Sequence, residues 1–191
     1  MILLTGFKPF LGQDLNPSLM LAKKYHEEFP SSSYFLELPV EYQTAQKRLE
    51  QFIESLPEFP QQVLLLGQAA GRSQICLERV ALNWIESQHV DEAGQVSVAR
   101  RIIAEAPAAY IQEEWTFDVG SLPKEIKVSH SAGTYVCNEL YFRALHKYSS
   151  LRKQICFVHV PLLPEQAKQG EASMSFEQQY FLLKNLIEVM K

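Results

Sequence analysis

Short apolar runs alternate along this chain with longer segments in which apolar residues recur every three or four positions. Short apolar runs are typical of strands buried on both faces of a sheet, whereas spacing by three or four predicts amphipathic helices. The predicted strands are 2–5, 34–40, 63–66, 126–129 and 155–160. The alternation predicts an α/β fold of three α/β/α layers around a mostly parallel, twisted central sheet.

Local signals predict where the helices begin. Asn16 followed by Pro17 is a cap and first-turn pair, and the segment 42–56 keeps helical spacing until a proline interrupts it. A third helix is expected to begin near Val136. Ser175, with a glutamine three residues later, forms a capping-box pattern that opens a C-terminal helix.

Length and pattern together predict one domain spanning residues 1–191. A chain of 191 residues with 47% hydrophobic residues fills one core, and neither repeats nor flexible linkers divide it. The segment 91–123 is the least periodic. Because long irregular loops in compact domains often form lids or subunit contacts, a homo-oligomer is one of the assembly states open to this chain.

Charge and cysteine usage narrow the classes of partner. The net charge is −4, and the basic residues are scattered, which argues against a nucleic-acid groove or a membrane-binding basic patch. The first residues lack a signal-peptide pattern, and no apolar run approaches the roughly 20 residues that span a bilayer. Three well-separated cysteines suit a reducing compartment. We therefore expect a cytoplasmic protein that acts on small neutral molecules, without a cofactor or a metal.

The segment 129–138 contains the most informative chemistry. Cys137 follows a turn containing Gly133, at the point where an apolar helical pattern begins. The free N–H groups and the dipole at a helix start favour the ionised thiol. A thiolate attacks carbonyl carbon, so Cys137 is a candidate nucleophile.

Candidate partners for this thiol lie in two other segments. His159 stands near the carboxyl end of the predicted strand 155–160, which is the edge of an open α/β sheet where active sites collect. Glu78 is a candidate carboxylate. A cysteine, a histidine and a carboxylate brought together suffice for nucleophilic amide hydrolysis.

Each residue also has a simpler interpretation. Taken alone, Cys137 could be a buried structural thiol, His159 a core histidine, and Glu78 a solvated carboxylate or the partner of Arg79. Of the other cysteines, Cys156 is three residues from His159 and is therefore expected on the opposite face of the strand. Cys76 is expected on a loop, in a packing role.

Four blocks in the order of one known family carry a resemblance along nearly the whole chain. The blocks are 3–10, 67–72 with 78–83, 131–138 and 158–166. Through them the sequence resembles the type I pyroglutamyl peptidases (pyrrolidone-carboxylate peptidases), cysteine peptidases that remove an N-terminal pyroglutamyl residue. The resemblance implies that Cys137 is the nucleophile, His159 the base and Glu78 the carboxylate.

The same resemblance implies a binding slot for the lactam ring of peptides with N-terminal pyroglutamate. It places Phe7 and Phe10 in the slot and Tyr135 and Val136 beside the nucleophile, while Gln68 is a candidate contributor of oxyanion donors. A small, flat, neutral lactam fits an apolar slot with a few polar groups. An unblocked N-terminal ammonium would lose its hydration there without a counter-charge.

Departures from the family pattern leave alternatives open. Ala70 stands where the family has a glycine, Cys76 and Leu77 replace a Thr-Pro pair, and Glu-Ser-Gln-His-Val at 86–90 replaces Asp-Ala-Arg-Ile-Pro. The segment between Tyr110 and Cys137 is shorter than usual. An inactive or re-specified relative that binds another small ligand is therefore the alternative. A zinc hydrolase is disfavoured, because the sequence has no two metal ligands at the short spacing typical of zinc sites. Phosphate binding at 67–71 is disfavoured as well, because the glycine-rich fingerprint of a phosphate-binding loop is absent.

Overall fold

The computed structural model describes residues 1–190 and contains a six-stranded central sheet in the order β2-β1-β3-β8-β4-β7. All neighbouring strands are parallel except β4 and β8, which are antiparallel. The strands are β1 (Ile2–Phe7), β2 (Ser33–Leu38), β3 (Gln62–Gln68), β4 (Ile75–Glu78), β7 (Ile126–Ser129) and β8 (Ile155–Val160). A separate antiparallel pair is formed by β5 (Val80–Leu82) and β6 (Ala109–Ile111).

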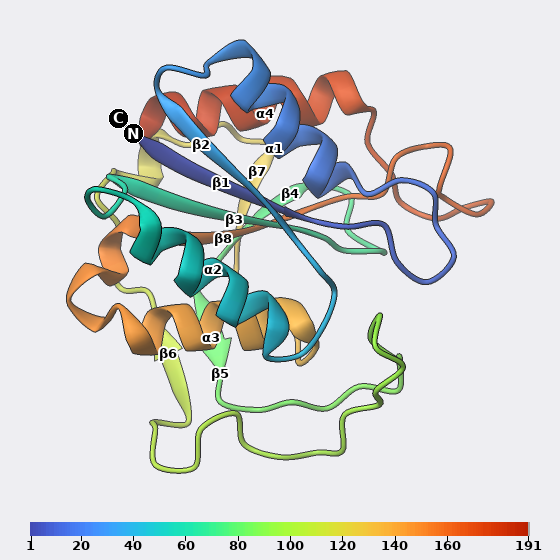
Figure 1. Ribbon diagram of the computed structural model, residues 1–191. Helices are drawn as coiled ribbons and strands as arrows, with labels where there is room; N and C mark the ends of the chain where they lie inside the picture. The colour runs from blue at the N-terminus through green and yellow to red at the C-terminus, as the bar shows by residue number, and fades with distance from the viewer. Residues whose placement is uncertain (191) are drawn as a thin grey trace.

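Helices cover both faces of the central sheet. Figure 1 shows α1 (Pro17–Glu28) and α4 (Phe176–Val189) on one face, and α2 (Thr44–Ser55) and α3 (Val136–Lys147) on the other. Two short 3₁₀ helices, η1 (Val119–Ser121) and η2 (Ser149–Gln154), lie in connections. The predicted three-layer α/β fold with a mostly parallel sheet is confirmed.

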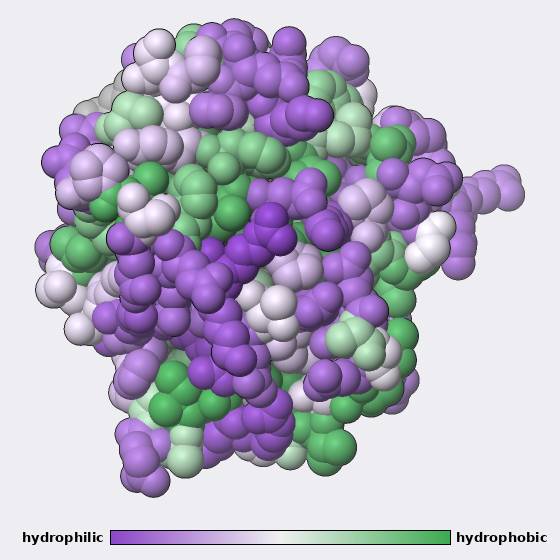
Figure 2. All heavy atoms as spheres, viewed as in Figure 1, coloured by the Kyte–Doolittle hydropathy of each residue, from purple (hydrophilic) through white to green (hydrophobic). Residues whose placement is uncertain are grey.

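Two apolar layers explain why the strand sequences read as continuous hydrophobic runs. Successive strand residues point to opposite faces, so Phe157 packs in the layer beside α2 and α3 whereas Cys156 and Val158 pack in the layer beside α1 and α4. Both layers are buried because both sheet faces are covered. Hydrophilic and hydrophobic side chains are interspersed on the outer face seen in Figure 2, where the helices turn their polar sides outward.

Some element boundaries differ from those expected. β2 ends at Leu38 rather than at residue 40, because Pro39 has no N–H to continue the ladder. The next amide, that of Val40, donates to the carboxylate of Glu92 instead. β4 was not predicted at all, and Cys76, expected on a loop, is a buried residue of this strand. Four residues between two other strands are too few to show a period.

The least regular part of the chain lies between β5 and β7. Side-chain hydrogen bonds organise it: Asn83 Oδ1 accepts from the amides of Ile102 and Ile103, each at 2.9 Å, and Asn83 Nδ2 donates to the Ile103 carbonyl at 2.7 Å. Within the predicted irregular segment 91–123, β6 and η1 are the regular elements. Its role as a lid or subunit contact stays a prediction. Across residues 1–190, no helix combines the length and apolar character needed to cross a membrane.

Candidate active site

Cys137 lies in the first turn of α3, directly after the extended cap residue Tyr135 and Val136. The chain enters this helix through Gly133, whose φ of +81° is a conformation that favours glycine. The sulfur rests over Gly67, near the carboxyl end of β3. A Cβ atom at position 67 would be only 3.0 Å from Cys137 Sγ and 2.9 Å from Phe157 Cζ. The absence of a side chain at Gly67 therefore makes room for the thiol.

The imidazole of His159 is buried and bonded to a buried carboxylate. Glu78 is directly opposite Phe157 in the antiparallel register of β4 and β8, so Glu78, Phe157 and His159 share one face of the sheet. His159 Nδ1 donates to Glu78 Oε1 at 2.8 Å, and these residues are 5% and 0% exposed. This bond selects the tautomer in which Nε2 is free to take a proton.

The register of β3 and β8 brings thiol and imidazole to the same place. Gly67 is the register partner of His159, and Gly67 is also the residue on which Cys137 Sγ rests. The structure therefore brings together all three residues predicted for the chemistry. They come from a helix start and two strands, separated by up to 81 residues in sequence.

Burial controls the charge of the thiol. Burial, which is the largest cause, and the negative charge of Glu78 together raise the pKa of Cys137 to about 12, although a backbone N–H hydrogen bond at the helix start lowers it in part. The expectation that the helix start makes the thiol easy to ionise is therefore wrong for this resting arrangement. Ionisation requires that the proton move to a neighbouring base, and His159, the register partner of Gly67 on β8, is the candidate base.

Arg72 is the cation that pairs with Glu78. Arg72 Nη2 donates to Glu78 Oε1 at 2.9 Å, and the guanidinium also bonds Ser129 Oγ at 3.0 Å and the Ser131 carbonyl at 3.2 Å. The considered pairing of Glu78 with Arg79 is not found: the Arg79 guanidinium lies 5.2 Å from the centroid of the Trp115 ring. Arg72 is the last residue of the block 67–72, but the sequence analysis assigned it no function.

A cavity of about 400 Å³ is lined by Gln68, which follows Gly67 in the chain, and by Tyr135, two residues before Cys137. Cys137, His159 and Glu78 are not themselves in its wall. Three of the five predicted binding residues line it: Phe10, Gln68 and Tyr135. The rings of Phe10 and Tyr135 stack with centroids 6.4 Å apart. Phe7 and Val136 are instead buried, 2% and 0% exposed, in the apolar cluster against which Phe10, Tyr135 and Cys137 pack.

Polar groups of the cavity come partly from residues that the prediction did not include. Gln166 Nε2 donates to Gln68 Oε1 at 3.0 Å, which leaves Gln68 Nε2 as a donor. His89 also lines the cavity, with its ring roughly perpendicular to that of Tyr135 at 6.4 Å. The departure from the family pattern at 86–90 therefore falls inside the cavity wall. Ala70, another departure, lines it as well.

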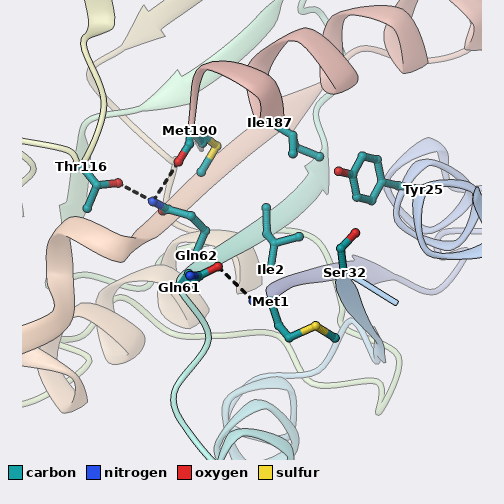
Figure 3. A pocket seen from close by; sticks show the side chains of 9 residues that line it. All are labelled: Met1, Ile2, Tyr25, Ser32, Gln61, Gln62, Thr116, Ile187 and Met190. Atoms are coloured by element: carbon teal, nitrogen blue, oxygen red, sulfur yellow. Dashed lines mark hydrogen bonds between the residues drawn. The ribbon is translucent and has the colours of Figure 1, made fainter. Parts of the chain in front are cut away.

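A second cavity, of about 410 Å³, opens at the other end of the sheet (Figure 3). Ile2 and Gln62, at the starts of β1 and β3, form part of its wall, and Ile187 of α4 faces them. None of the residues predicted for catalysis or binding lines it. The cavity beside Gln68 and Tyr135 is therefore the candidate binding site.

A thiol at a helix start, beside a buried imidazole that is bonded to a carboxylate at the edge of an α/β sheet, defines a cysteine-dependent hydrolase. The model of one family, described as pyroglutamyl peptidase, matches residues 1–191. This chain belongs to the pyroglutamyl peptidase family and is a cysteine exopeptidase of that type.

Individual relatives agree with this assignment over nearly the full chain. A pyrrolidone-carboxylate peptidase of Vibrio vulnificus (strain YJ016) is 38% identical, covering 92% of this chain and 85% of the relative. One from Bacillus mycoides (strain KBAB4) is 35% identical, covering 91% and 85%. The crystal structure of the pyrrolidone carboxyl peptidase of Fervidobacterium islandicum AW-1 is similar with a TM-score of 0.87 at 36% identity, covering 98% and 96%. Bacillus amyloliquefaciens pyroglutamyl peptidase I gives a TM-score of 0.86 at 31% identity, covering 99% and 95%.

Proposed function

We propose that Cys137, His159 and Glu78 carry out the cleavage that releases an N-terminal pyroglutamyl residue from a peptide. The observation that carries this proposal is the 2.8 Å bond between His159 and Glu78 next to Gly67, the glycine that accommodates the sulfur of Cys137. Glu78 orients the imidazole and stabilises its charged form, as the carboxylate of a nucleophilic triad does.

The reaction proceeds through an acyl-enzyme. His159 Nε2 takes the thiol proton of Cys137, and the thiolate attacks the carbonyl carbon that joins the lactam residue to the next residue. The carbon–sulfur bond forms, the carbon–nitrogen bond breaks, and the imidazolium of His159 protonates the leaving amine. His159 then takes a proton from water, whose oxygen displaces Cys137 and releases pyroglutamate. The displaced thiolate recovers a proton from His159.

Charge develops on the carbonyl oxygen during attack, so donors must face it. Backbone N–H groups in the first turn of α3 lack helical acceptors and lie at the nucleophile itself. Gln68 Nε2 is a second donor, because its amide oxygen is already occupied by Gln166. These groups form the proposed oxyanion site.

The cavity suits a neutral lactam ring. Phe10 and Tyr135 supply flat apolar surfaces, and His89 supplies a polar ring nitrogen for the lactam. A free N-terminal ammonium would be desolvated against the two aromatic rings, which disfavours ordinary aminopeptidase substrates. The three cysteines are free, and a reducing cytoplasmic setting would keep Cys137 as a thiol.

Release of a fluorescent amine from a pyroglutamyl amide tests the proposal. Purified protein is compared with a Cys137→Ala variant, and a proline amide serves as the control substrate. Turnover by the unaltered protein alone, restricted to the lactam, supports both nucleophile and substrate. A folded, reduced sample without turnover would contradict the proposal and favour the re-specified relative, for which the changes at 86–90 provide the structural reason.

A further inference from the structure

Arg72 links three separate parts of the site. It lies in the turn between β3 and β4, and its guanidinium contacts Glu78 at the end of β4, Ser129 at the end of β7 and the carbonyl of Ser131. Ser131 belongs to the connection that leads into α3 and Cys137. One planar group therefore joins the carboxylate strand to the segment that positions the nucleophile.

Glu78 needs this partner because its carboxylate is fully buried. The side chain is 0% exposed, and Oε1 accepts from both His159 Nδ1 and Arg72 Nη2. Oε2 is buried without a hydrogen-bond partner among the described residues. An ionised carboxylate in such a place is costly unless a cation compensates it. Arg72, with a side chain 29% exposed, supplies the positive charge of its guanidinium.

The other titratable groups around Glu78 do not supply a permanent positive charge. Tyr141 donates its hydroxyl to the Glu78 carbonyl at 3.0 Å, and burial raises its pKa, so it stays neutral. Cys76 opposes His159 in the register of β4 and β8, and the Cys137 sulfur lies against Gly67, the register partner of His159 on β3; both are thiols. Within the described structure, Arg72 is thus the fixed cation of this cluster.

Arg72 changes the net charge of the site when the thiolate forms. When Cys137 transfers its proton to His159, the site holds a thiolate, an imidazolium and the Glu78 carboxylate. Without Arg72 those three groups sum to −1, and the imidazolium is shared between two anions. With Arg72 the sum is zero, so the Glu78 charge is compensated and the imidazolium can stabilise the thiolate.

We propose that Arg72 is a positioning residue that compensates and orients Glu78, and thereby allows His159 to hold Cys137 as a thiolate during attack. This inference rests on the proposed roles of Cys137, His159 and Glu78. It assigns Arg72 no contact with substrate: the residue acts through Glu78 and through the connection at Ser131.

Two substitutions at position 72 test the inference. Arg72→Gln removes the charge. Arg72→Lys keeps the charge but loses the planar guanidinium, whose several N–H groups reach more than one partner at once. Arg48→Gln, on the exposed face of α2, removes the same charge away from the site and is the matched control. The readouts are kcat and KM on a pyroglutamyl amide, the thermal unfolding midpoint, and the pH dependence of Cys137 alkylation by iodoacetamide, with the modified peptide identified by mass spectrometry.

We expect Arg72→Gln to lower kcat at least about tenfold with little change in KM, and to move the alkylation profile of Cys137 upward by about one pH unit. Arg72→Lys should fall between this variant and the unaltered protein, and Arg48→Gln should match the unaltered protein. An Arg72→Gln protein that is less stable but keeps its kcat and its alkylation profile would overturn the inference. If Arg72→Gln does not fold, an alkylation profile and a kcat of Arg72→Lys identical to those of the unaltered protein would overturn it equally.

The alkylation arm needs no substrate, which separates this inference from the proposed function. Absence of pyroglutamyl amide turnover by the unaltered protein contradicts the function alone. An alkylation profile that shifts in Arg72→Gln and not in Arg48→Gln still supports the charge role of Arg72, and an unshifted profile contradicts it whatever the turnover.

Discussion

Replacing Gly67 by alanine places one methyl group between the sulfur and the core. The new Cβ would lie 2.9 Å from Phe157 Cζ and 3.0 Å from both Phe157 Cε1 and Cys137 Sγ. Carbon atoms in contact prefer separations of roughly 3.5–4.0 Å. Either the Phe157 ring or the first turn of α3 must therefore move. Because Phe157 is fully buried, the partly exposed Cys137 side is expected to give way.

The displacement has separate effects on rate and on stability. Restoring ordinary contact requires a shift of about 0.5–1 Å at the sulfur, and a misplacement of about 1 Å at a reacting group can lower the rate about 100-fold. Overpacking a buried position typically lowers the free energy of unfolding by about 1–3 kcal/mol. We therefore expect kcat to fall about 100-fold in a protein that still folds.

The assay compares Gly67→Ala with Gly94→Ala. Gly94 has a φ of +75° and no atom within 4 Å of an added Cβ, so alanine there strains the backbone by about 1–2 kcal/mol without touching the site. Steady-state kinetics on a pyroglutamyl amide and urea unfolding are measured for both variants. Gly94→Ala should keep its kcat. Full activity of a folded Gly67→Ala protein would refute the argument that the sulfur rests on this glycine.

Three further outcomes follow from the site and its supports. Glu78→Gln should lower kcat by about 10³-fold or more, because the amide neither stabilises the imidazolium nor selects its tautomer; a loss below tenfold in steady-state assays would contradict this. Asn83→Ala should lower the free energy of unfolding by about 2–4 kcal/mol in urea titrations, since one buried and one partly buried amide lose their acceptor; an unchanged midpoint would show that other contacts hold the loop. Burial raises the pKa of Cys137 from 9.0 to about 12, so above pH 9 the unfolded chain loses this proton first and stability falls as pH rises. Between pH 9 and 10 the free energy of unfolding should fall by about 1 kcal/mol more in the unaltered protein than in Cys137→Ala, and parallel curves would contradict the shift.

Much of the architecture could be predicted because it depends on local pattern. Both faces of the central sheet are covered, so strands such as β3 and β8 are mainly apolar, and the Asn16 and Ser175 caps mark helix starts that the structure confirms. β4 was not predicted, because a strand of four residues is too short to show a recognisable pattern of apolar and polar positions. Cys76 was placed on a loop for the same reason.

At the candidate site, too, the sequence predicted some features and not others. The residue types and their order in four blocks singled out Cys137, His159 and Glu78, since few side chains can act as nucleophile, base and orienting carboxylate. Phe7 and Val136, also implied by the resemblance, lie in the core rather than in the wall of the cavity. A motif shows which residues are present, but it does not show which way each side chain faces.

The sequence by itself determined the alternation of strands and helices, the helix start at the thiol and the chemical types at the site. Only the tertiary structure decided that Glu78 pairs with Arg72 rather than with its neighbour Arg79, and that burial raises the pKa of Cys137 despite the helix start. The reason is physical. Strand register and burial depend on contacts between segments far apart in the chain, and charge in a buried site depends on those contacts rather than on local sequence.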